Sequence, residues 1–296
     1  MKRLREFEYY EPASIPEAVQ ILSAAGDGAR VLAGGTDLVV DMKMGRMRPS
    51  TVVNLKGISG LSGVEDDEGG TRIGALTKVT DVEASTLVQR RHPALAQAAS
   101  VLASPPVRAL ATIGGNVGRA SPASDLGPAL IVHDARASVT GVEGTRDELV
   151  EDLYVEPGAT SLVPSDIITH FTLPQPPPGF GSAHVKLGKR GSGTDIALAA
   201  VSASVVIGSA GEILDCRIAL ASLGPTPFRA MATESLLRSE LPTEALLAAA
   251  ADTASGEAEP IDDMRASASY RTILARVLTL RALRGALESV GVGVAA

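Results

Sequence analysis

The chain has 296 residues, of which 45% are hydrophobic and 21% charged, a composition typical of a globular protein with two or three compact units. Its 27 basic and 34 acidic residues give a net charge of −7 without a basic, aromatic-interleaved cluster, so nucleic acid is not an expected partner. It has no run of about 18 apolar residues, and its charged N-terminus, MKRLREFEYYEP, is unlike a signal peptide. We therefore expect a cytoplasmic protein without membrane insertion.

The first fifty-odd residues predict a small α/β unit, which we place at residues 1–57. Ser14 is a suitable helix cap, and Pro16 and Glu17 fall in the first turn that it would open. The β-branched content of TVVNL is typical of a strand. In chain order we expect a helix over 14–25, a strand over 29–34, a helical turn or irregular segment ending at Gly45, and a strand over 51–55.

Residues 58–175 predict a second α/β unit. His92, at a helix start, is expected to face solvent. Its elements, in chain order, are a strand over 69–76, a helix capped by Thr80 that begins at Asp81, a helix over 93–104 stopped by Pro105 and Pro106, strands over 129–148 around a tight turn at Gly141 to Gly144, and the segment DIITHFTLP over 166–174.

The third unit, residues 176–296, follows a Pro-rich linker at 174–182. Strands over 196–227 turn near Gly208 to Gly211, and helices follow over 231–240, 243–254 and 268–288. Arg265 and Tyr270 are expected to tie the last helix to the sheet. The fold class is thus α+β, with two α/β units followed by a small antiparallel sheet and a helical bundle.

The cysteine and histidine content argues against a metal site in this chain. The single cysteine, Cys216, cannot alone hold zinc or an iron–sulfur cluster, and the four histidines lack ligand spacing. We expect Cys216 to be a small buried residue in a strand. Any redox metal is expected in another subunit.

The motif AGGTDL at 33–38 is suited to a phosphate, because paired glycines let backbone N–H groups approach a ligand closely. Thr36 can add a hydroxyl donor, whereas Asp37 would repel phosphate and suits a sugar hydroxyl or a backbone amide. The alternative is structural: the glycines end a strand in a turn, and Thr36 and Asp37 cap a helix.

The second motif, TIGGNVGRASPASDL at 112–126, has the same character and adds Asn116, Ser124 and Asp125. Its small residues would let a flat or extended ligand lie against the backbone, although a loop rich in Ser, Pro and Asp also forms for turn reasons alone. Neither motif has the lysine of a P-loop or the pattern G-x-G-x-x-G. Two phosphate-capable loops indicate a diphosphate held between them.

In this order, FEYYEP, AGGTDL, IGAL, VRALATIGGN, ASPASDL, a Lys followed by an Arg, and DMRASASYR span essentially the whole chain. The chain therefore resembles the FAD-binding (medium) subunit of the molybdenum hydroxylases, the xanthine dehydrogenase and aerobic carbon monoxide dehydrogenase family. The resemblance implies FAD between two α/β subdomains of the PCMH type, followed by the C-terminal sheet and helices.

The resemblance also implies the site residues. The diphosphate would be held by Leu32, Ala33, Gly34, Gly35, Thr36, Asp37 and Leu38. Thr112, Gly115 and Asn116 would lie against the cofactor, with Ser124 and Asp125 at its polar parts, Ile167 and Ile168 beside the flavin ring, and Lys186 near the isoalloxazine, where its charge would stabilise the reduced flavin. No catalytic residue for substrate chemistry is expected in this chain.

The resemblance implies two partners, a large subunit with the molybdenum cofactor and a small subunit with [2Fe–2S] clusters. It also implies that the three-subunit unit assembles as a dimer of heterotrimers. Electrons would pass from the clusters to FAD and on to NAD⁺, a quinone or O₂. The family often has the pattern I-R-N-x-G just before TIGGN, whereas this chain has VRALA, with Ala109 and Ala111 at the Asn and Gly positions. The chain also departs from the family in the loop after Arg190, whose conformation the sequence does not predict. A stand-alone flavin oxidase or reductase, or a scaffold with degenerate loops, remains the alternative.

Overall fold

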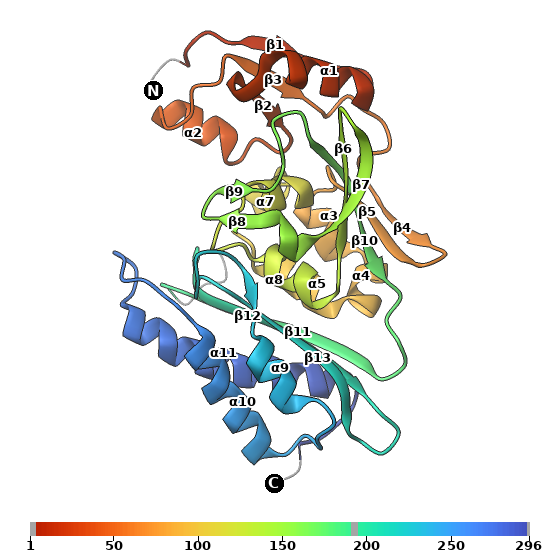
Figure 1. The fold of residues 1–296 in the computed structure, drawn as a ribbon, viewed down its shortest axis with the longest axis vertical. Coiled ribbons are helices and arrows are strands. Elements are labelled where there is room, and N and C mark those ends of the chain that lie inside the picture. The colour runs from red at the N-terminus through yellow and green to blue at the C-terminus, as the bar shows by residue number, and fades with distance from the viewer. Residues whose placement is uncertain (1–3, 191–194, 295–296) are drawn as a thin grey trace.

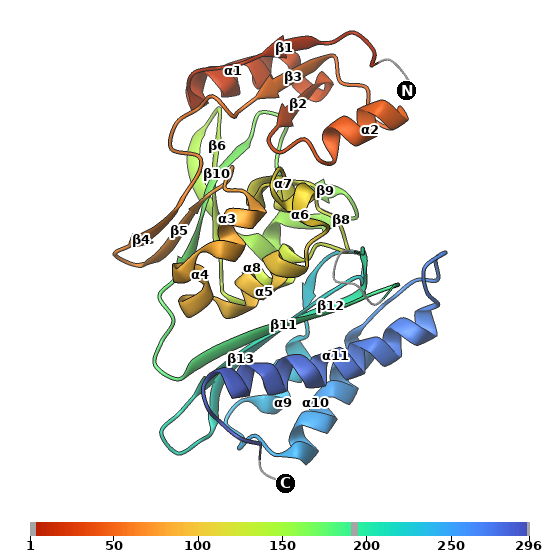
Figure 2. The ribbon, with the colours of Figure 1, turned by 180° about the vertical axis from the view of Figure 1, so that it is seen from behind.

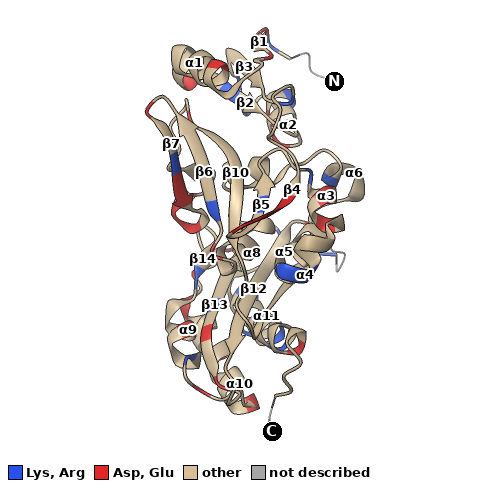
Figure 3. Cartoon of the chain, turned by 90° about the vertical axis from the view of Figure 1, so that its right-hand side faces the viewer, with Lys and Arg blue, Asp and Glu red and all other residues tan. Residues whose placement is uncertain are grey.

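The structure is a computed structural model that describes residues 4–190 and 195–294. The molecule is elongated and consists of three layers stacked along its long axis, with the N-terminal layer at one end and the C-terminal layer at the other (Figures 1 and 2). Charged residues of both signs are spread along the chain in all three layers, with acidic residues on β4 and β7 (Figure 3). The loop after Arg190, left open by the sequence, lies outside the described residues.

The N-terminal layer is a parallel sheet of order β1-β3-β2 with α1 packed against it. As predicted, α1 begins after Ser14, whose hydroxyl accepts a hydrogen bond from the Glu17 N–H. Gly45, with φ of +76°, ends α2 in the left-handed conformation. The elements are β1 (Glu8–Tyr10), α1 (Ile15–Ala25), a short 3₁₀ turn (Gly26–Gly28), β2 (Ala29–Leu32), α2 (Leu38–Met44) and β3 (Thr51–Asn54).

The middle layer is an antiparallel sheet of order β4-β5-β10-β6-β7, with short helices covering one face. Its strands are β4 (Val64–Asp67), β5 (Gly70–Gly74), β6 (Arg136–Gly141), β7 (Gly144–Leu149) and β10 (Ile167–Pro174), with the hairpin β8 (Tyr154–Glu156) and β9 (Ala159–Thr160) beside them. Its helices are α3 (Val79–Ala84), α4 (Thr86–Arg91), α5 (Pro93–Val101), α6 (Pro105–Arg108), α7 (Ile113–Gly118), α8 (Leu126–Val132) and a 3₁₀ turn (Val150–Leu153).

Three predicted boundaries in this layer are wrong. Helix α3 begins after Lys78 and not after Thr80, because Lys78 pairs with Thr112 and brings the chain into the helix earlier. Helix α5 ends at Val101, and three residues separate it from Pro105, which begins α6 because a proline in the first turn needs no N–H group. Residues 129–132, expected in a strand, belong to α8; every residue of α8 is buried, so its apolar run carries no helical period.

The C-terminal layer is an antiparallel sheet of order β11-β12-β13-β14. Helices α5 and α8 of the middle layer cover one face and the C-terminal helices cover the other, which is why β12 is buried along most of its length. The predicted linker spans only residues 175–179, because β11 already begins at Phe180. The elements are β11 (Phe180–Gly188), β12 (Ala197–Ile207), β13 (Ile213–Ala221), β14 (Phe228–Arg229), α9 (Met231–Leu237), α10 (Glu244–Glu257) and α11 (Ala268–Ser289).

Arg271, and neither Arg265 nor Tyr270, ties α11 to the sheet. The buried Arg271 guanidinium donates to the backbone oxygens of Leu198, at 2.6 Å, and Ser222, at 3.2 Å. Arg265 pairs with nearby Asp263 and Tyr270 is 44% exposed. The predicted residues are wrong because Arg265 lies before α11 begins, at Ala268, and Tyr270 lies on an exposed side of the helix.

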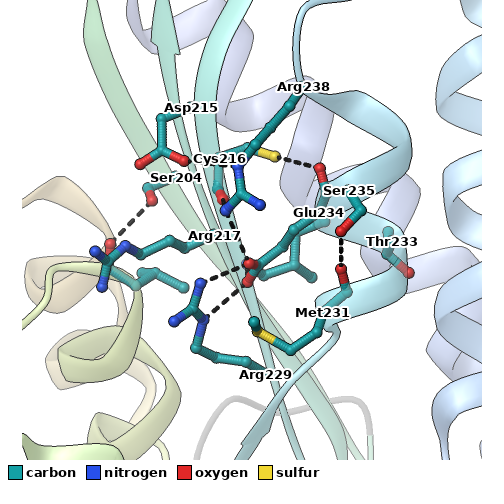
Figure 4. Close-up of polar contacts among 12 residues, drawn as sticks. Ser204, Asp215, Cys216, Arg217, Arg229, Met231, Thr233, Glu234, Ser235 and Arg238 are labelled. Carbon is teal, nitrogen blue, oxygen red and sulfur yellow. Dashed lines mark hydrogen bonds and ion pairs between the residues drawn. The ribbon is translucent and has the colours of Figure 1, made fainter.

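A buried carboxylate joins α9 to the edge of the C-terminal sheet (Figure 4). Glu234 is fully buried; it accepts hydrogen bonds from the Arg229 guanidinium, at 2.6 and 3.0 Å, and from the Ile218 N–H. Cys216 lies in β13 and is buried, as predicted, and burial raises the pKa of its thiol to about 12. Because Arg229 also lies 3.6 Å from Glu151, the cluster connects the C-terminal and middle layers.

A pair of buried histidines lies at the same junction. His92, predicted to face solvent, is fully buried: its Nε2 lies 3.0 Å from the Thr71 hydroxyl and its Nδ1 lies 3.4 Å from His133 Nδ1. Ser182 of β11 contacts the other side of His133, at 3.3 Å. The prediction is wrong because the C-terminal sheet covers this helix start. Burial lowers the pKa of His92 to about 4, so the ring is neutral at pH 7.

None of the helices in residues 4–190 and 195–294 is long and apolar enough to cross a membrane.

Candidate cofactor site

A cavity of about 710 Å³ lies between the N-terminal and middle layers, and both glycine motifs line it. The predicted residues that line the cavity are Ala33, Gly34, Gly35, Thr36, Asp37, Leu38, Thr112, Gly115, Asn116, Ser124, Asp125, Ile167 and Ile168. Leu32 lies just outside it as the last residue of β2, and Lys186 lies behind Asp125. The sequence-predicted residues therefore converge on one space, although they come from segments more than 100 residues apart.

The first motif leaves its backbone donors open. Within the described part of the chain, the N–H groups of residues 34–38 donate to no protein acceptor. Gly35 takes φ of +77° to make the turn, a conformation that glycine adopts without strain. These consecutive free donors border the cavity, so they are available to an anionic ligand.

The second motif uses its donors internally. Thr112 caps α7 by accepting a hydrogen bond from the Gly115 N–H at 3.1 Å, and the Gly114 N–H donates to Ala75 O at 2.8 Å. The Ile113 and Asn116 N–H groups are also bonded within the protein. This motif therefore offers the ligand a smooth surface and polar side chains, and no row of N–H groups.

The two motifs touch. A Cβ atom on Gly34 would lie 2.3 Å from the carbonyl oxygen of Leu110 and 3.0 Å from the Cα of Ala111, in the segment that leads into the second motif. Glycine is therefore required at position 34 by the approach of another backbone segment. The contact brings the open donors of the first motif against the floor formed by the second.

Polar side chains of the second motif form a connected group. The Ser124 hydroxyl donates to Asn116 Oδ1 at 2.6 Å and accepts the Gly127 N–H. Beside them, Asp125 Oδ2 accepts a hydrogen bond from Lys186 Nζ at 2.8 Å, and Lys186 also donates to Val101 O. Both ionic side chains are almost fully buried, at 8% and 2% exposure.

Asp125 Oδ1 is buried without a hydrogen-bond partner among the described residues. Burial raises the pKa of Asp125 to about 6, although the nearby Lys186 charge opposes this rise. Since Asp125 lines the cavity, its unpartnered oxygen is an acceptor suited to an N–H or O–H group of a ligand. Lys186 does not line the cavity itself; its ammonium group contacts Asp125, which does.

Sequence reasoning missed a charge cluster beside the first motif. Arg119 Nη2 lies 3.3 Å from Asp41 Oδ2, and its Nε lies 3.7 Å from Asp37 Oδ1; all three residues line the cavity. Asp41 follows Asp37 by one helical turn, and Arg119 belongs to the second motif, so the spacing of Asp37 and Asp41 was the available signal. Their pairing with Arg119 depends on how the layers meet.

The cavity fits a long ligand with an anionic centre. Its volume is in the range of small-molecule sites, free N–H groups line one part, and an orphan carboxylate oxygen lies at another. Ile167 and Ile168, at the start of β10, add apolar surface, as does Leu162. Among the described residues, no group of His, Cys, Asp or Glu side chains is arranged to hold a metal ion.

Two family models match most of this chain. Residues 5–176 match the family model for the FAD binding domain in molybdopterin dehydrogenase, and residues 183–286 match that for the CO dehydrogenase flavoprotein C-terminal domain. The chain belongs to the molybdopterin dehydrogenase flavoproteins. FAD is accordingly its cofactor, and it is the FAD-binding subunit of an oxidoreductase complex of the carbon monoxide dehydrogenase and xanthine dehydrogenase type.

Relatives of this flavoprotein match along almost their whole length. The carbon monoxide dehydrogenase medium chain of Hydrogenophaga pseudoflava is 33% identical over 95% of this chain and 96% of its own. The xanthine dehydrogenase FAD-binding subunit of Escherichia coli O157:H7 is 28% identical, over 96% and 97%. A solved structure of carbon monoxide dehydrogenase from H. pseudoflava superposes with a TM-score of 0.93 at 32% identity, covering 97% of this chain and 99% of that one. The predicted fold class is confirmed.

Proposed function

We propose that this flavoprotein holds FAD across the cavity, with the diphosphate on the open donors of residues 34–38. The free N–H groups carry this assignment, because a diphosphate needs several convergent donors. Ile167 and Ile168 then lie beside the flavin ring, and Asp125 Oδ1 accepts a hydrogen bond from a donor of the flavin portion. Asn116, Ser124, Thr112 and Gly115 form the surface against which the cofactor lies.

FAD, when bound, supplies one- and two-electron chemistry, and the protein supplies its position and its electrostatic surroundings. Asp125 presents an acceptor of fixed direction, because Lys186 and the surrounding burial hold the carboxylate in place. Lys186 offsets the negative charge of that carboxylate, so an ionised Asp125 disfavours an anionic occupant of the cavity less than an unpaired carboxylate would. The apolar wall at Ile167 and Ile168 excludes water from the same region.

We further propose that the chain works between two partners. The name medium chain, which relatives carry, supports one larger and one smaller partner. We propose that the larger partner carries the molybdenum cofactor and the smaller one [2Fe–2S] clusters, in a cytoplasmic dimer of heterotrimers. Electrons enter FAD from the clusters and leave to NAD⁺, a quinone or O₂. Relatives of similar identity are named for carbon monoxide and for xanthine, which supports a substrate site outside this chain, and we place it in the large subunit.

The test is the flavin content of the purified full chain, alone and co-expressed with its partner subunits. We expect a flavin absorption spectrum and acid-released FAD. Gly34→Ala should abolish both, because its Cβ would lie 2.3 Å from a backbone oxygen at the motif contact. Gly256→Ala on α10, where a Cβ meets nothing within 4 Å, is the matched control.

A chain that binds no FAD in either preparation would contradict the cofactor assignment. Flavin retained at wild-type level in Gly34→Ala would contradict the position of the diphosphate. The electron route is tested in the assembled complex: substrate should reduce the flavin only when the small subunit is present.

A further inference from the structure

The open donors of the first motif have acidic neighbours. Asp37 is part of the motif, and Asp41 is one helical turn further along α2 with its side chain only 6% exposed. Both line the cavity. Two carboxylates beside an anion-binding loop would repel a diphosphate unless another group offsets their charge.

Arg119 is positioned to offset it. Its guanidinium spans the two carboxylates, at 3.3 Å from Asp41 and 3.7 Å from Asp37, and its side chain is 37% exposed. It extends from the end of α7, so the second motif supplies the cation that the first motif lacks. Arg46 also pairs with Asp41, at 2.7 Å, but is 63% exposed and does not line the cavity.

We propose that Arg119 is the residue that makes the site selective for ligands with a diphosphate, with Asp41 as the positioning residue that holds its guanidinium at the first motif. The proposal rests on the proposed function, in which the FAD diphosphate lies at residues 34–38. With Arg119 present, the two carboxylates and two arginines are together neutral; without it, one negative charge remains beside the phosphates.

The guanidinium suits this task in its geometry as well as its charge. Arg presents several N–H donors in a plane, and two of its nitrogens face the carboxylates here, which leaves donors for a phosphate oxygen. The buried Asp41 holds the Arg119 guanidinium in one orientation, whereas a ligand phosphate can replace the exposed Asp37 as the second partner of the guanidinium. A lysine could restore the charge but not the two-sided contact.

The experiment compares three ligands on the full chain by calorimetry: FAD, ADP-ribose, which shares the diphosphate, and riboflavin, which has none. We expect Arg119→Gln to weaken FAD and ADP-ribose by about tenfold or more at low salt and to leave riboflavin unchanged. Arg46→Gln, which removes an equal charge from the outer side of Asp41, should change FAD binding less than about twofold. The difference in FAD affinity between the wild-type chain and Arg119→Gln should become smaller as salt is added, because salt screens the charge.

Thermal unfolding of each ligand-free variant separates binding from folding. Arg119→Lys, which keeps the charge but not the two-sided contact, should bind FAD more tightly than Arg119→Gln and less tightly than the wild-type chain. Equal losses for FAD and riboflavin, or equal losses in Arg119→Gln and Arg46→Gln, would overturn the proposal and leave Arg119 as a link between layers. Wild-type affinity in Arg119→Gln would overturn it while the FAD assignment stands; a wild-type chain that binds no FAD would overturn both.

Discussion

The two glycine motifs are similar in composition and opposite in use. In AGGTDL the backbone N–H groups of residues 34–38 have no protein acceptor among the described residues, whereas in TIGGN the N–H groups of residues 113–116 are all bonded within the protein. The first motif therefore presents free backbone donors to the cavity, whereas the second presents a surface whose backbone donors are already hydrogen-bonded. The comparison shows that paired glycines alone do not identify a phosphate loop.

The difference follows from where the threonine stands. Thr112 precedes its glycines by two residues and so becomes the N-cap of α7, where its hydroxyl takes the Gly115 N–H. Thr36 follows its glycines, and its hydroxyl has no hydrogen bond to the described residues. The order of residues around the glycines therefore decides whether the donors face a ligand or a helix.

Lys186→Met should have the largest effect, because it leaves the Asp125 carboxylate buried and unpaired on the closed side of the cavity. We expect unfolding free energy to fall by about 3 kcal/mol at pH 8. The pKa of Asp125, already raised to about 6, rises further without the lysine, so the loss shrinks as pH falls to 5 and the carboxyl takes a proton. Urea unfolding at both pH values checks this, with the exposed Lys189→Met as control; a pH-independent loss would contradict it.

Gly114→Ala should destabilise the ligand-free chain by about 2 kcal/mol through overpacking, since its Cβ would lie 2.8 Å from both the Cβ and the carbonyl oxygen of Ala75. Gly118→Ala, in the same helix with nothing within 4 Å of its Cβ, should be neutral or stabilising. Denaturant unfolding distinguishes the two. Equal stability of the variants would show that the second motif is not the closed, packed element described here.

The pH dependence of binding should separate the two ends of the cavity. Burial raises the pKa of Asp125 to about 6 in the free protein, and a ligand donor requires the ionised form. Below pH 6 binding must release a proton, so FAD affinity should fall by up to about tenfold per pH unit. ADP-ribose, held by backbone donors, should bind equally from pH 5 to 8. Asp125→Asn should abolish the fall of FAD affinity below pH 6. If the affinity of this variant still fell below pH 6, another group would be responsible for the pH dependence.

A matched pair of threonine variants should give the smallest and cleanest contrast. Thr112→Val removes the cap of α7 and should lower unfolding free energy by about 1 kcal/mol with little change in FAD affinity. Thr36→Val should leave stability within about 0.5 kcal/mol and weaken FAD a few-fold. The serine variants keep both hydroxyls and serve as controls. The reverse pattern would interchange the roles of the two motifs.

Local rules predicted what is local in this protein. The Ser14 cap, the β-branched strand at Thr51–Asn54 and the turn between Gly141 and Gly144 all followed from neighbouring residues. Helix α8 was missed because its uniform burial removes any period, and His92 was misplaced because the sheet that covers it lies about 90 residues later in the chain.

The candidate site shows the same limit. The motifs predicted which residues line one cavity, because glycine pairs and small polar residues mark it in the sequence. The pairs Lys186–Asp125 and Arg119–Asp41 were not predicted, since each joins elements from different parts of the chain. Long-range packing decides such ion pairs, and no local pattern encodes it.

The sheet of the C-terminal layer has a consequence for the cooperativity of unfolding. Helices α5 and α8 of the middle layer cover one face of this sheet, and the His92–His133–Ser182 contacts lie between them and the sheet. The middle and C-terminal layers are therefore packed against each other through a continuous buried region. Cutting the chain in residues 175–179 would expose apolar surface on both pieces. These layers should therefore melt in a single calorimetric transition, even though their sequences match two separate domain models.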